Sequence, residues 1–86
     1  MKSTAEIEER IKRGLAKRLG KQDSEIQNQS KLVEDLGLDS LDTFELLFEL
    51  EKEFDIEIPT LDALRFVRVQ QVIAYIQDKT LDKETI

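Results

Sequence analysis

Ser40 has the setting most suited to covalent chemistry, because its hydroxyl follows Asp39 at a point where a helix is expected to begin. A serine hydroxyl needs an adjacent base to act as a nucleophile. The chain contains no His and no Cys, so the usual general base, the thiolate nucleophile and the common zinc ligands are all missing. No lysine-based dyad is evident around Ser40 either. The sequence therefore gives almost no support to a hydrolase, and residue type alone favours a helix cap.

A second possible chemistry is calcium binding, suggested by three aspartates in this region, Asp35, Asp39 and Asp42. An EF-hand loop needs an oxygen ligand at position three, glycine at position six and a bidentate Glu at position twelve. Taking Asp35 as position one puts Gly37, Ser40 and Leu46 at these places. This spacing excludes a specific metal site, although weak binding of divalent ions stays possible.

The composition limits the chain to a small, acidic fold. Its 86 residues are enough for one domain with one core, and 40% of them are hydrophobic. Residues 34–57 contain ten acidic residues against the single Lys52. Nucleic acid is a poor partner for such a surface, whereas basic protein surfaces fit it. No apolar run approaches the length of a membrane span, so we expect a cytoplasmic protein.

The hydrophobic spacing predicts helices throughout. A capping-box pattern and apolar residues at every fourth position predict a first helix over residues 4–19, followed by a long polar loop over 21–37. A second helix is expected from Asp39 or Ser40 to Phe54, a short one after Pro59, and a last one from Val69. Residues 79–86 are expected to be a frayed tail. The fold class is thus all-α: a four-helix bundle with three long helices and a short third one, in a single domain over residues 1–86.

The second predicted helix has two apolar arcs, at 100° per residue. One arc holds Leu46, Leu47, Leu50 and Phe54, and the other holds Leu41, Phe44 and Phe48. Together they cover more than half of the helix, which is wider than a core-facing stripe needs. Because acidic residues flank the second arc, it is typical of an interaction site. The alternative is that all seven side chains belong to the core.

The wider string Val33-Glu34-Asp35-Leu36-Gly37-Leu38-Asp39-Ser40-Leu41-Asp42 resembles the attachment motif of acyl carrier proteins, which read D-S-L within an L-G-x-D-S-L context. The resemblance covers nearly the whole chain, including Glu57-Ile58-Pro59 and the closing helix with Tyr75-Ile76. It implies a non-enzymatic carrier with 4'-phosphopantetheine, donated by coenzyme A, on Ser40. Acyl groups then travel as thioesters on the arm, which supplies the thiol that a chain without Cys lacks.

The resemblance also implies roles for neighbouring residues. Asp39 and Leu41 become recognition neighbours of Ser40. It implies that partner enzymes contact Leu41, Phe44, Phe48, Asp42, Glu45, Glu51 and Glu57. It also implies that the core or the acyl cavity contains Leu46, Leu50 and Phe54. The implied partners are a phosphopantetheinyl transferase and acyl-synthesis or acyl-transfer enzymes with basic docking patches, and the implied state is a monomer without nucleic-acid partners.

The sequence departs from the family near the expected third helix, where Arg65 and Arg68 accompany Asp62 in a stretch that is commonly acidic in fatty-acid carriers. Val69 also lacks the expected Ser or Thr cap before it. A specialised carrier for polyketide, peptidyl or D-alanyl groups is therefore an alternative to a fatty-acid carrier. A helical interaction module without a prosthetic group is the alternative from another class.

Overall fold

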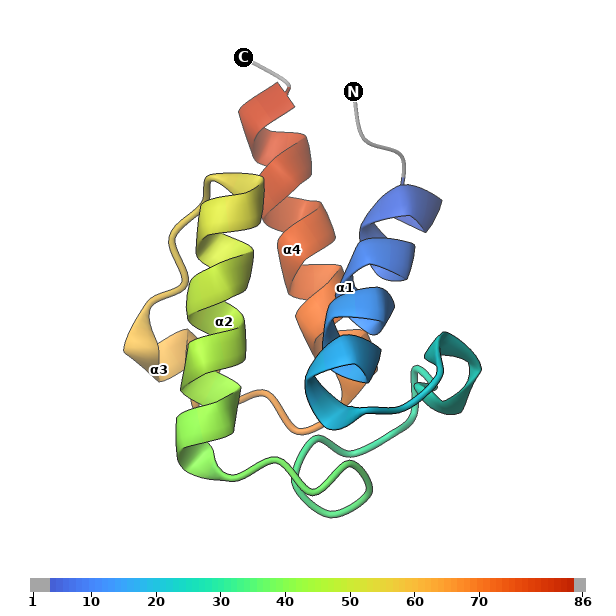
Figure 1. Ribbon diagram of the computed structural model, residues 1–86. Helices are drawn as coiled ribbons and strands as arrows, with labels where there is room; N and C mark the ends of the chain where they lie inside the picture. The colour runs from blue at the N-terminus through green and yellow to red at the C-terminus, as the bar shows by residue number, and fades with distance from the viewer. Residues whose placement is uncertain (1–3, 85–86) are drawn as a thin grey trace.

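The computed structural model describes residues 4–84 and contains four α-helices and one turn of 3-10 helix (Figure 1). Within these residues the only extended pairing is an isolated bridge between Lys31 and Arg68. The predicted all-α class, with three long helices and a short third one, is confirmed. The elements are α1 (Thr4–Leu19), η1 (Asp23–Glu25), α2 (Ser40–Phe54), α3 (Thr60–Ala63) and α4 (Val69–Glu84).

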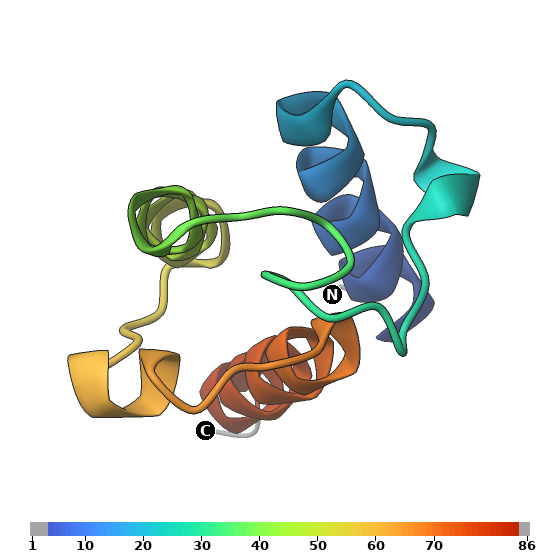
Figure 2. The same ribbon diagram turned by 90° about the horizontal axis from the view of Figure 1, so that it is seen from below.

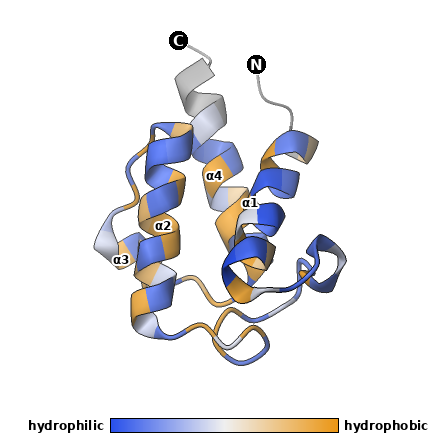
Figure 3. Ribbon diagram, viewed as in Figure 1, coloured by the Kyte–Doolittle hydropathy of each residue, from blue (hydrophilic) through white to orange (hydrophobic). Residues whose placement is uncertain are grey.

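The core forms where the apolar stripes of the three long helices meet (Figure 3). Each helix buries residues three or four positions apart, as the helical period requires. Burying each such side chain contributes about 1.5–3 kcal/mol. The core residues of the long helices are Ile7, Ile11, Leu15 and Ala16 of α1, Leu46, Leu47, Leu50 and Phe54 of α2, and Val69, Val72, Ile73 and Ile76 of α4.

The long loop between α1 and α2 crosses beneath the helices and supplies the missing cap of α4 (Figure 2). The backbone N–H of Val69 donates to the carbonyl of Ser30 at 3.0 Å, and that of Gln70 donates to Asn28 at 2.9 Å. The side chain of Gln71 accepts from the N–H of Arg68 at 2.9 Å. The first N–H groups of a helix have no partner within it. Here the loop and Gln71 satisfy them, so no Ser or Thr cap is needed.

The expectation that residues 79–86 fray is wrong for residues 79–84, because α4 continues through Glu84. Thr80 lies about one turn beyond the fully buried Ile76 and is itself only 8% exposed. The buried face of α4 therefore extends beyond Ile76, and the burial of Thr80 supports the additional turn. Residues 85–86 lie outside the described part of the chain.

Tyr75 connects α4 to α3. Its hydroxyl donates to Oδ2 of Asp62 at 2.6 Å, and its ring meets that of Phe66 edge to face, with 5.3 Å between the ring centroids. Burial, followed by the hydrogen bond to Asp62, raises the pKa of Tyr75 to about 12.

This raised pKa predicts a loss of stability at alkaline pH. The folded protein keeps the phenol proton between pH 10 and 12, where the unfolded chain has released it, so the stabilisation is complete below pH 10 and is lost as pH rises through 12. Tyr75 is the only tyrosine, so phenolate absorbance measures its titration directly. We expect a midpoint near 12 in the folded protein and near 10 in denaturant. Equal midpoints in the two conditions would contradict the assigned contact, and Asp62→Asn should lower the folded value.

Candidate functional site

Ser40 is the first residue of α2 and lies at the end of the long loop. Its side chain is exposed, and none of the hydrogen bonds formed among residues 4–84 uses its hydroxyl. The two other serines in the described part of the chain differ in position. Ser24 is exposed within η1, whereas the half-buried Ser30 accepts a hydrogen bond from the N–H of Gln27 at 3.2 Å. Ser40 is therefore the exposed serine at the start of a long helix.

Asp39, and not Ser40, is the cap of α2. Its Oδ1 accepts from the N–H of Asp42 at 2.7 Å, and the carboxylate of Asp42 accepts in return from the N–H of Asp39 at 3.4 Å. The hydroxyl of Thr43 donates to the Asp39 carbonyl at 2.9 Å. Such a reciprocal cap typically contributes about 1 kcal/mol, and both carboxylates favour the positive end of the helix. Because Asp39 takes the capping role, the Ser40 hydroxyl is left for other chemistry.

The loop just before Ser40 is held by two buried leucines. Leu36 and Leu38 are 8% and 1% exposed, and the intervening Gly37 has φ +74°, a backbone conformation that glycine adopts at little cost. The N–H of Leu38 donates to the Leu32 carbonyl at 3.0 Å, which closes the turn. The buried side chains thus anchor the loop on both sides of the turn and fix the position of Ser40.

The two arcs of α2 separate as predicted. Leu41, Phe44 and Phe48 are 66%, 41% and 57% exposed, whereas Leu46, Leu50 and Phe54 are between 2% and 5% exposed. The alternative that all of them are core is wrong. The exposed arc begins next to Ser40, and Lys52 places its Nζ 4.5 Å from the centroid of the Phe48 ring. We call Leu41, Phe44 and Phe48 the α2 strip.

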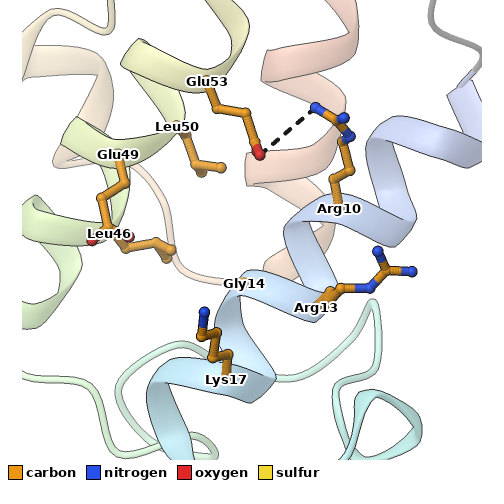
Figure 4. A pocket seen from close by; sticks show the side chains of 8 residues that line it. All are labelled: Arg10, Arg13, Gly14, Lys17, Leu46, Glu49, Leu50 and Glu53. Carbon is orange, nitrogen blue, oxygen red and sulfur yellow. Dashed lines mark ion pairs between the residues drawn. The ribbon is translucent and has the colours of Figure 1, made fainter.

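Several acids of α2 are engaged with α1, which the sequence analysis did not foresee. Arg18 pairs with Glu49 at 2.8 Å and with Glu45 at 3.6 Å, and the hydrogen bond to Glu49 raises the pKa of Arg18. Arg10 reaches Glu53 at 3.7 Å across a groove between the two helices (Figure 4). Exposed pairs of this kind contribute about 0.2–1 kcal/mol each. These acids therefore attach α2 to α1. Because arginines of α1 pair with them, the unpaired negative charge on α2 is smaller than the number of its acidic residues implies.

The other acids predicted to contact partners lie in different surroundings. Glu51 is half-buried, and its Oε2 accepts from the N–H of Ile58 at 3.1 Å, which holds the connection between α2 and α3. Asp42 is half-buried in the cap described above, and Glu57 is exposed. The structure thus leaves the carboxylate of Glu57 at the surface and commits those of Asp42 and Glu51 partly to the fold.

Gly14 lies in the same groove, on the α1 side, opposite Leu46 and Leu50 (Figure 4). Apart from its chain neighbours and the backbone of α1 itself, a methyl group added at Gly14 would meet no atom within 4 Å. We expect Gly14→Ala to raise the free energy of unfolding by about 0.5–1 kcal/mol, because glycine in a helix interior costs that much relative to alanine. The matched change Gly37→Ala should destabilise, since φ at that residue is +74°. Urea melts check both, and a destabilised Gly14→Ala variant would contradict the open groove.

Two further features of residues 4–84 concern metal ions and membranes. No group of three or more His, Cys, Asp or Glu side chains among them could hold a metal ion. No helix in residues 4–84 is long and apolar enough to cross a membrane.

The fold and the exposed serine at a helix start match the class of small helical carrier domains. A family model described as "Phosphopantetheine attachment site" matches residues 9–76, which is most of the chain. The chain belongs to this family of phosphopantetheine-binding carrier domains. Its members are non-catalytic, carry a 4'-phosphopantetheine prosthetic group, and depend on a phosphopantetheinyl transferase and on client enzymes.

Proposed function

We propose that Ser40 is the attachment site of the phosphopantetheine arm and that the protein is an acyl carrier protein. The observation that carries the proposal is the exposed Ser40 hydroxyl at the start of α2, free of hydrogen bonds with the rest of residues 4–84. A transferase can reach such a hydroxyl without unfolding the helix. The group fits the site, because Asp39 caps the helix and the buried Leu38 anchors the preceding loop.

The arm supplies a thiol that holds acyl groups as thioesters, and the chain's own residues then position that arm. Ser40 holds the phosphate end, while Asp39 and Leu41 are the neighbours that a transferase recognises. The start of a helix also favours a negative charge, which suits a phosphodiester at this position.

We propose that the α2 strip is the surface where client enzymes dock, with Asp42, Glu45, Glu51 and Glu57 as its acidic surroundings. Exposed apolar residues beside carboxylates suit a partner with a basic patch around an apolar centre. In this proposal Leu46, Leu50 and Phe54 form the interior that can shelter an acyl chain. The whole chain then acts as one carrier domain and as a cytoplasmic monomer.

The cargo is proposed to be a fatty-acid intermediate, as in the carriers that the D-S-L motif resembles. The basic residues Arg65 and Arg68 near α3 favour the second candidate, a specialised carrier of polyketide, peptidyl or D-alanyl groups. Both candidates share the arm and the serine, and they differ in the enzyme that loads the thiol.

A loading assay separates a fatty-acid carrier from a D-alanyl or peptidyl carrier. The protein is first converted to its phosphopantetheine form with coenzyme A and a transferase. It is then offered malonyl-CoA with a fatty-acid malonyl transferase, D-alanine and ATP with a D-alanyl ligase, or an amino acid and ATP with an adenylating ligase, and its intact mass is followed. Fastest loading by the malonyl transferase supports the fatty-acid assignment. Faster loading by either ligase overturns it in favour of a specialised carrier.

A further inference from the structure

The segment containing α3 exposes an unusual number of apolar side chains. Leu61, Leu64 and Val67 are 73%, 66% and 52% exposed, although they lie within seven residues of one another. The buried Ala63 and the half-buried Phe66 anchor the segment against the rest of the protein. Clusters of exposed apolar residues on a small protein mark interaction sites. Because three large side chains share so short a segment, we treat it as a second apolar surface.

Arg65 lies in the middle of this surface and differs from the other arginines. Its side chain is exposed, and no ion pair or hydrogen bond among the described residues includes its guanidinium. The remaining four arginines of the chain are engaged within the fold. Arg10, Arg13 and Arg18 pair with carboxylates, and Arg68 donates to the carbonyl of Gln29 at 2.8 Å. Arg65 is therefore available to a carboxylate from outside the molecule.

The order of residues around α2 relates this surface to the α2 strip. At 100° per residue, starting from the side that faces α1, the exposed positions follow one another as Glu49, Glu45, Lys52, Leu41, Phe48 and Phe44, and the half-buried Glu51 comes next. The first two pair with Arg18 of α1, and the last bonds to Ile58 in the connection that leads to α3. Figures 1 and 2 both show α3 on the side of α2 away from α1. The α2 strip thus lies between an acidic edge, formed by Glu45 and Glu49, and the second apolar surface, which contains Arg65.

We propose that a client enzyme docks across α2 and α3 together and presents a carboxylate to Arg65. The partner's surface then carries basic groups opposite Glu45 and Glu49, an apolar centre opposite the strip and the apolar residues of the α3 segment, and an acidic residue at the far edge. This inference rests on the proposed carrier function. Opposite charges at the two edges fix the orientation of the partner, since the reversed orientation brings like charges together.

A carboxylate in a protein fits this surface better than a free phosphate does. Exposed Leu64 and Val67 lie on either side of Arg65 in the sequence, and their burial requires an apolar surface around the anion. Arginine forms two parallel hydrogen bonds with a carboxylate and with a phosphate alike, so the apolar neighbours favour a carboxylate held in a protein surface.

The test uses the enzyme that loads the phosphopantetheine form fastest in the assay above. We expect Arg65→Glu to lower kcat/KM for this enzyme by about tenfold, because an attraction becomes a repulsion at close range. The matched control is Lys21→Glu, which makes the same charge change at an exposed residue just beyond the end of α1. It should alter kcat/KM by less than about twofold. Replacing the partner's acidic residues one at a time by Lys should identify one that restores the rate with Arg65→Glu.

Labelling of each variant by the transferase keeps this inference separate from the proposed function. If the parent protein gains no arm, the carrier proposal fails, and the docking inference fails with it. If the arm is added but Arg65→Glu is loaded as fast as the parent, only the docking inference is overturned. It is also overturned if Arg65→Glu is slow and no partner substitution restores the rate. Thermal melts and Arg65→Gln, which should show a smaller loss than Arg65→Glu, separate a docking defect from misfolding.

Discussion

The Ser40→Ala variant should gain no phosphopantetheine when it is incubated with coenzyme A and a transferase, whereas the parent protein should gain one group per chain. The transfer breaks the pyrophosphate bond of coenzyme A, forms a phosphodiester bond to the serine oxygen, and releases adenosine 3',5'-bisphosphate and the hydroxyl proton. Alanine has no oxygen to offer. Because the Ser40 hydroxyl makes no hydrogen bond with the rest of residues 4–84, its removal should leave the thermal midpoint nearly unchanged. Intact-mass spectrometry measures the labelling.

Ser24→Ala is the matched control for this experiment, because Ser24 is also an exposed serine within the residues that the family model matches. Ser24 lies in the short η1 turn, whereas Ser40 begins a helix of 15 residues. Full labelling of Ser24→Ala together with none of Ser40→Ala is the expected pair of results. Labelling of Ser40→Ala to the level of the parent would assign the arm to another residue.

Phe54→Ala should lower the free energy of unfolding by about 3–5 kcal/mol, the typical cost of removing a core phenylalanine. The Phe54 side chain is 5% exposed and packs in the core of the bundle. Phe48→Ala should cost less than about 1 kcal/mol, because the Phe48 ring is 57% exposed and its one described ring contact is with the ammonium of Lys52. Urea melts of the two variants, fitted with a common slope, give both values.

The comparison also separates stability from docking. Phe48→Ala should fold as well as the parent but be loaded more slowly by a client enzyme, since the α2 strip is proposed to touch the partner. Similar losses of stability in the two variants would mean that the strip packs within the protein in solution. In that case the α2 strip would not be exposed in solution and would no longer support the docking proposal.

The bounds of the first two long helices could be predicted because local signals define them. Residues 4–19 carry an apolar residue at every fourth position and end before Gly20, which has φ +69° in the structure. Asp39 provides a cap for α2, and the start of that helix was predicted to within one residue. The separation of the α2 strip from the core followed from the helical period alone. Each of these features depends on residues within a few positions of one another.

The contacts that join distant segments could not be predicted. The carbonyls of Asn28 and Ser30 cap α4 from forty residues earlier in the chain, and no local pattern announces that. The acids of α2 counted in the sequence as free surface charge, but the pairing of Arg18 with Glu45 and Glu49 depends on how α1 packs. The last turns of α4 were missed for a similar reason, since Thr80 is polar by type and buried only by tertiary packing.

The candidate site was predictable in part. Residue type alone favoured Ser40 as a cap, and the structure assigns the cap to Asp39. The resemblance of residues 33–42 to a carrier motif indicates Ser40 independently of its exposure. In the sequence, Arg65 is only a departure from the family pattern. Its lack of a partner among the described residues became visible once the other arginines were placed.

The intact mass of the protein purified from its source organism tests the carrier assignment most directly, with fragmentation to locate any added group. We expect a mass raised by one phosphopantetheine, with or without an acyl group, and the modification on the peptide that contains Ser40. Treatment with hydroxylamine, which cleaves thioesters, should remove the acyl group and leave the arm. A protein that carries no added mass under any growth condition, or an arm on another residue, would contradict the assignment of Ser40.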